Sequence, residues 1–120
     1  MKVSEADRMI LEAKTAEETK KAIEMGANLK DPHIAFAGFV LAHELKQIEI
    51  LRDAGADINA MYLGRTPLME VETGEKTELL LKGGADPNIK DKDGLIAPMI
   101  HQSYEKTKIF LEKNKKYRRW

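Results

Sequence analysis

The sequence predicts an all-α protein built from about four short helix-turn-helix units that stack into one solenoid. The triplet Gly-Ala-Asx begins at residues 26, 55 and 84, which are 29 residues apart. Each triplet follows a run with the apolar spacing of a helix, and a fourth such run, EKTKIFLEK, precedes Asn114. Repetition at this period is typical of solenoids, because each unit can bury its apolar face only against its neighbours.

The composition is that of a globular protein and excludes several classes of site. The chain has 120 residues, 42% hydrophobic and 33% charged, and a formal net charge of zero. It contains no cysteine, which excludes disulfides, thiolate metal sites and a cysteine nucleophile. Its longest apolar run, at 34–42, is far shorter than the roughly 20 residues of a transmembrane helix. The N-terminus is acidic where a signal peptide is apolar, so we expect a cytoplasmic protein without membrane contact.

The triplets divide the chain into repeats within a single domain, residues 1–120. In each repeat the glycine follows the last helical turn, where a positive φ ends the helix and a Cβ is costly. We expect repeats at 4–28, 29–57, 58–86 and 87–114, followed by a basic tail at 114–120.

The first two repeats are expected to contain two helices each. The first helix of the second repeat, IAFAGFVLA, is apolar nearly all round, which indicates burial on both sides. We therefore expect its large side chains in the core, namely Phe36, Phe39, Val40 and Leu41. The predicted helices are at 5–13, 16–25, 33–42 and 44–54.

The third and fourth repeats add a turn-rich segment before the first helix. In the third repeat, Thr66 is a good N-cap and Pro67 suits the first helical position, where its missing N–H is no loss. The segments before these helices are rich in turn residues, as in ADPNIKDKDG, and we call them finger three (58–65) and finger four (87–95). The predicted helices are at 66–72, 75–82, 98–103 and 104–113.

The strings GGADPNIKDKDG, GADINA and GRTPLM resemble the ankyrin repeat, which joins two antiparallel helices to a β-turn finger over about 33 residues. The resemblance covers nearly the whole chain, although the units are shorter here. The finger of the second repeat is reduced to LKDPH, and Met69 occupies the place of the family's usual histidine. The resemblance implies an ankyrin-type solenoid with β-turn fingers. It also implies binding of other proteins through a concave face of fingers and first helices, without catalysis.

No pattern in the sequence indicates chemistry. His33, His43 and His101 lack metal-ligand spacing, and neither Ser4 nor Ser103 lies in a nucleophile elbow. The string LKGGAD lacks the Lys-Ser/Thr of a phosphate-binding loop and follows a helix rather than a strand. We therefore expect no enzyme, no catalytic residue, no metal and no cofactor.

The tip of finger three is unusually apolar. It reads Met-Tyr-Leu where finger four has Lys-Asp-Lys, although turn tips are normally solvated and polar. Two interpretations are open: these side chains cover the shortened finger of the second repeat, or they anchor a partner protein. On the second interpretation, the predicted contact residues are Met61, Tyr62, Leu63, Arg65 and Glu70, with Lys90 and Lys92 on the rim.

The basic tail offers an alternative. Residues 106–120 carry seven basic side chains and one acidic, a net charge of +6, whereas residues 1–105 carry −6. A basic run with interleaved aromatics is compatible with nucleic-acid contact or with a solvated chain end. We favour the solvated end, since the acidic remainder repels phosphates. The nucleic-acid alternative assigns contact to Lys115, Lys116, Arg118, Arg119 and Trp120.

Taken together, these observations predict a non-enzymatic protein-binding module, acting as a stoichiometric inhibitor of the immunity type or as an adaptor. Its partner would be another protein, such as a toxin or an enzyme that it inhibits. The acidic body suits a basic partner through electrostatic steering.

Overall fold

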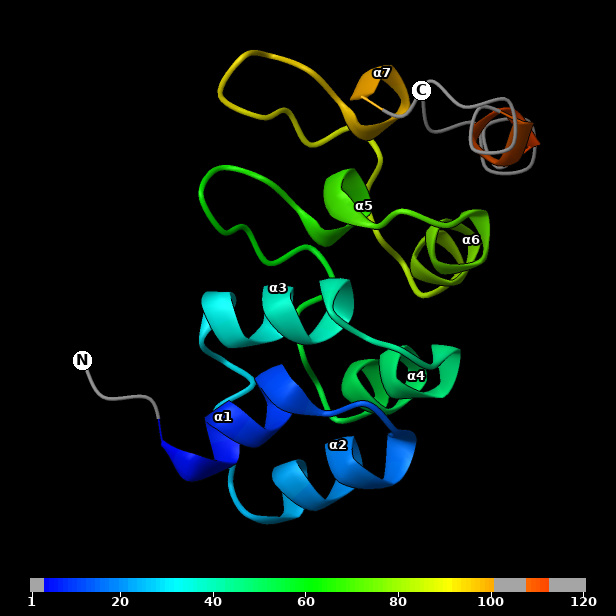
Figure 1. Cartoon of the computed structure of the whole chain (residues 1–120). Helices are drawn as coiled ribbons and strands as arrows, with labels where there is room; N and C mark the ends of the chain where they lie inside the picture. The colour runs from blue at the N-terminus through cyan, green and yellow to red at the C-terminus, as the bar shows by residue number, and fades with distance from the viewer. Residues whose placement is uncertain (1–3, 101–107, 113–120) are drawn as a thin grey trace.

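The computed structural model describes residues 4–100 and 108–112, which form helices joined by turns (Figure 1). The helices stack in two rows, the first helix of each repeat in one row and the second in the other. The molecule measures 40 × 27 × 21 Å along its principal axes, so it is elongated along the stack. The predicted all-α solenoid is confirmed. Its helices are α1 (Glu5–Glu12), α2 (Ala16–Glu24), α3 (Pro32–Val40), α4 (Leu45–Asp53), α5 (Pro67–Glu70), α6 (Gly74–Lys82), α7 (Ala97–Ile100) and a helical segment at 108–112.

The first helix of the third repeat is shorter than predicted. We expected it to reach residue 72, but α5 ends at Glu70 and Val71 has extended dihedral angles. Val71 then lies in the core, and Thr73 already caps α6 by accepting the Lys76 N–H. Because only three residues connect the helices, no further turn of α5 can form. In the fourth repeat, the second half of the predicted span 98–103 and the ends of 104–113, with Asn114, lie outside the described residues.

The repeated triplet has one structural role in all three copies. Its glycine has φ near +100°, and the N–H groups of the glycine and the alanine close a Schellman cap on the second helix. The third residue of the triplet accepts the N–H two positions further on, which turns the chain into the next repeat. The alanine N–H bonds that close the caps are Ala27 to Ala22, Ala56 to Leu51 and Ala85 to Leu80, at 3.1, 3.0 and 2.9 Å.

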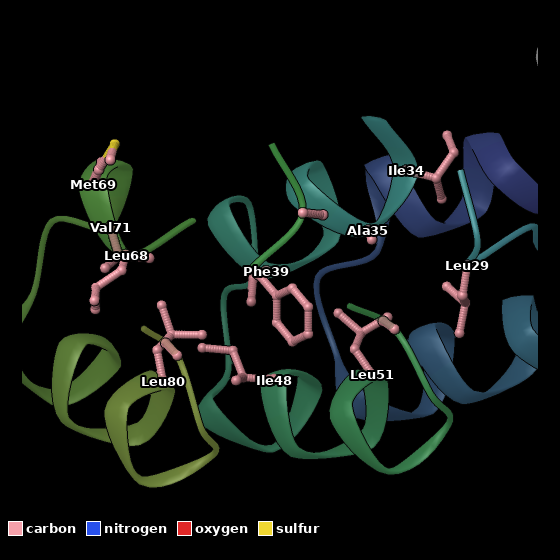
Figure 2. Close-up of a cluster of buried hydrophobic side chains, with 14 of the residues drawn as sticks. Leu29, Ile34, Ala35, Phe39, Ile48, Leu51, Leu68, Met69, Val71 and Leu80 are labelled. Atoms are coloured by element: carbon pink, nitrogen blue, oxygen red, sulfur yellow. The ribbon is translucent and has the colours of Figure 1, made fainter. Parts of the chain in front are cut away.

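The core runs continuously between the two rows of helices (Figure 2). Phe39 is fully buried, and its ring lies between α3 and the Ile48 and Leu51 side chains of α4. Leu80 continues this layer into the third repeat, below Leu68 and Val71. A solenoid of this kind is stabilised by contacts between neighbouring repeats, so loss of any one layer weakens the whole stack.

Of the four large side chains predicted to lie in the core, only one is fully buried. Phe39 is buried, but Phe36 and Val40 are only partly buried and Leu41 is 50% exposed. Leu41 is the C-cap of α3, where the chain leaves the interface between the rows. Its apolar neighbours in the sequence therefore gave no information on its own burial.

A buried glutamine joins the first and second repeats. The Gln47 side chain is 2% exposed, and its Nε2 donates to the Ala13 carbonyl and to Thr19 Oγ1, at 3.1 and 2.9 Å. Its Oε1 accepts the N–H groups of His43 and Glu44, at 2.7 and 2.8 Å. Both amide hydrogens and the carbonyl oxygen are thus used, which is what burial of this group requires.

In the part of the chain that the structure describes, no helix is long and apolar enough to cross a bilayer.

Candidate functional site

Finger three ends in a two-residue hairpin turn. The N–H of Tyr62 donates to the Arg65 carbonyl at 2.9 Å, and the N–H of Arg65 donates to the Tyr62 carbonyl at 3.1 Å. Between them, Leu63 and Gly64 have φ angles of +52° and +77°, the pattern of a type I′ turn. Glycine adopts this geometry freely, whereas a leucine Cβ makes it unfavourable. Leu63 is the only non-glycine residue with positive φ among those described.

Tyr62 fastens the hairpin to the second repeat. Its ring stacks on the His33 ring, with the ring centroids 4.3 Å apart and an angle of 16° between the planes. It also packs against the Phe36 ring, with a centroid distance of 5.6 Å. His33 and Phe36 belong to α3, whose own finger is reduced to a short loop. For Tyr62, the structure therefore shows the first of the two open interpretations, in which the tip covers the second repeat.

The base of the hairpin is fastened to α5 by an ion pair. Arg65 Nε lies 2.6 Å from Glu70 Oε1, and both side chains are about one-third exposed. The carboxylate and the guanidinium largely neutralise each other, so this pair orients the finger more than it offers a free charge. An exposed pair of this kind typically stabilises by no more than about 1 kcal/mol.

Two apolar side chains of finger three are exposed. Met61 is 41% exposed and Leu63 is 79% exposed, the highest value of any large apolar residue that the structure describes. Met61, Tyr62, Leu63, Arg65 and Glu70, which the sequence predicted to act together, are thus in one hairpin and the helix that follows it.

Finger four projects from the same edge of the molecule as finger three (Figure 1). Its loop is organised by Asp91, whose carboxylate accepts the N–H groups of Leu95 and Asp93 at 2.9 and 2.8 Å. The Leu95 hydrogen bond lowers the Asp91 pKa below its ordinary value, with smaller contributions from Asp93 and from the Arg65 charge on finger three. Lys90 and Lys92 flank this turn and are exposed.

The sequence did not predict a groove between the end of α3 and the α5–α6 connection. This groove has a volume of about 500 Å³. Leu41 lines this groove because it is not buried in the core, and the sequence pattern gave no signal for that exposure. The lining residues are Val40, Leu41, Ala42, His43, Glu70, Glu72, Thr73 and Lys76.

Among residues 4–100 and 108–112, no three histidine or carboxylate side chains gather closely enough to hold a metal ion. The tail residues of the nucleic-acid alternative, Lys115, Lys116, Arg118, Arg119 and Trp120, lie outside the described residues, as does His101.

The fold and the projecting fingers define a class: helical solenoids that carry turn-based fingers along one edge. Residues 63–92, from the tip of finger three through α5 and α6 to finger four, match the ankyrin repeat family. The chain therefore contains an ankyrin repeat, and residues 64–69 and 83–92 of this match carry motifs from which the sequence indicated the family. Comparison with curated proteins found no match. Ankyrin repeats are protein–protein interaction modules and generally have no enzymatic activity.

Proposed function

We propose that this protein is a non-enzymatic, stoichiometric binding protein that acts as an inhibitor or adaptor by covering part of a partner protein. The observation that carries the proposal is the braced apolar tip of finger three. Exposed leucine and methionine on a fixed hairpin contribute nothing to the core, but they offer apolar area to another protein. The proposed contact set is Met61, Tyr62, Leu63, Arg65 and Glu70, with Lys90 and Lys92 on the rim.

The architecture favours inhibition or adaptation over other roles. A short array has one finger-bearing edge, which suits a single partner. Because the hairpin is held by α3 and α5 before binding, little conformational freedom is lost on association. A cytoplasmic toxin or enzyme whose active surface is covered in this way would be inhibited at a ratio of one to one.

Two side chains of equal exposure allow a matched test. Met61 on finger three is 41% exposed, and Leu45 at the start of α4, in the other row of helices, is 40% exposed. We would capture partners from lysate of the source organism with the full-length protein, then measure the affinity, stoichiometry and activity of the purified partner. We expect Met61→Ser to weaken binding about tenfold and Leu45→Ser to leave it unchanged. Equal effects of the two substitutions, or a partner held elsewhere, would contradict the proposed surface.

The basic tail provides the alternative, which the charge division of the sequence supports. Removal of residues 114–120 should leave partner binding intact if finger three is the site. If the truncated protein folds normally but loses its partner, the tail is the binding element. If the full-length protein binds RNA or DNA with an affinity that falls steeply with salt, the alternative function is supported.

A further inference from the structure

We infer that Leu63 is the anchor of this surface: it fills an apolar pocket in the partner protein, and the rim of that pocket carries carboxylates that pair with Lys90 and Lys92. This inference rests on the proposed function and specifies the partner's chemistry.

The backbone conformation at Leu63 is one that leucine rarely adopts. The first central position of a type I′ turn strongly favours asparagine, aspartate or glycine, which tolerate positive φ. Leucine at φ +52° is unfavourable for folding, and a side chain 79% exposed gains almost no burial in return. The free protein therefore shows no folding benefit from leucine at this position, although its apolar surface would be useful on binding.

The hairpin that carries Leu63 is held in place before any partner binds. The tip is closed by two backbone hydrogen bonds, and the residues on both sides of the turn are fixed. Tyr62 stacks on His33 of α3, and Arg65 pairs with Glu70 of α5. A leucine held in this way resembles the pre-ordered anchors that carry most of the energy of an interface, because few degrees of freedom remain to be lost.

Two lysines of finger four provide positive charge at the finger edge. Lys90 and Lys92 are exposed, and neither forms an ion pair with a residue that the structure describes. Asp91 lies between them but directs its carboxylate to two backbone N–H groups of its own turn.

The partner's chemistry follows from this arrangement. The described residues include 13 basic and 19 acidic side chains, a net charge of −6, which by itself favours a basic partner. At the finger edge, however, Lys90 and Lys92 are exposed without an ion pair to a described residue, and the Asp91 carboxylate accepts two N–H groups of its own turn, although Asp93 beside Lys92 is also exposed. Ion pairs with these lysines require carboxylates on the partner. The overall charge therefore favours a basic partner, whereas the contact surface itself favours acidic groups.

Site-specific cross-linking tests the anchor directly. A diazirine-bearing leucine analogue replaces Leu63 in the full-length protein, and the same analogue at Leu45 is the matched control. After irradiation in lysate of the source organism, we expect one protein to be linked through position 63 and not through position 45. We also expect a carbodiimide to couple Lys90 or Lys92 to an aspartate or glutamate of the same protein.

The purified partner then gives the quantitative test. We expect Leu63→Asn to fold at least as well as the wild type, because asparagine suits the turn, and to bind 10- to 100-fold more weakly. Leu63→Met should bind within a few-fold of the wild type. Binding of Leu63→Asn within twofold of the wild type, or a captured partner that never links through position 63, would overturn the anchor. Absence of carbodiimide coupling at both lysines would overturn the acidic rim. Failure of the wild type to capture any protein would instead refute the proposed function itself.

Discussion

Replacement of Gln47 by leucine should be the most damaging single change to the joint between the first and second repeats. Leucine approximates the volume of glutamine but can neither donate nor accept. The Ala13 carbonyl and the Thr19 hydroxyl would lose a buried donor, and the N–H groups of His43 and Glu44 would lose an acceptor in a partly solvated place.

The cost can be estimated group by group. A buried polar group left without a partner costs about 1–3 kcal/mol, whereas a partly solvated one recovers most of its hydrogen bonding from water. Two buried groups and two partly solvated groups give a total of about 3–4 kcal/mol. Since small domains unfold with only about 5–15 kcal/mol, this is a large fraction of the stability.

The assay is urea unfolding of the full-length protein, followed by circular dichroism at 222 nm. Lys46→Leu is the matched control, since the Lys46 side chain is 67% exposed and lies one residue away. We expect little change for the control and a lower midpoint for Gln47→Leu. A loss of less than about 1 kcal/mol for Gln47→Leu would refute the network's role, because one orphaned buried group alone should cost that much.

Three other substitutions test separate features. Leu63→Asn should raise the free energy of unfolding by about 1 kcal/mol, because asparagine tolerates the positive φ at this position better than leucine does. A lower melting temperature would contradict that reasoning. Gly38→Leu should destabilise by about 1–3 kcal/mol in urea unfolding, because even a Cβ at this position lies 3.0 Å from Leu51 Cδ1; unchanged stability would show that the α3–α4 contact is loose. Asp91 has a lowered pKa when folded, so its contribution to stability is present above the ordinary value of 3.8 and is lost as the pH falls below it. Asp91→Ala should therefore lower stability at neutral pH and reduce the acid loss in a pH series of unfolding curves, and an unaltered pH profile would argue against this effect.

Local rules were enough to predict the repeated parts of the fold. Gly-Ala-Asx at a fixed interval specifies a Schellman cap followed by a side-chain-supported turn, and both depend only on residues within one turn of chain. The starts of α2 and α6 follow likewise from N-cap threonines, since the Thr15 and Thr73 hydroxyls accept the N–H groups of Glu18 and Lys76. The Thr66 hydroxyl at the start of α5, in contrast, has no hydrogen-bond partner among the described residues. These elements were predicted to within about two residues at most ends, as is usual for helix boundaries.

The candidate site could be predicted only in part. An apolar turn tip in the sequence was sufficient to single out finger three. Which of its residues packs inward depends on the presence of His33 and Phe36 beside it, and these lie some thirty residues earlier in the chain. Of the three tip residues predicted as anchors, the structure shows Tyr62 stacked on α3 and leaves Leu63 the most exposed.

The sequence by itself determined the all-α repeat architecture, because caps, turns and helical periodicity are properties of short segments. The tertiary structure decided what those segments do to one another. It buried Gln47 among four partners, exposed Leu41 at the end of an otherwise apolar helix, and fixed Leu63 in a left-handed turn. Burial and exposure are set by which surfaces meet across neighbouring repeats, and these contacts join residues that no local pattern relates.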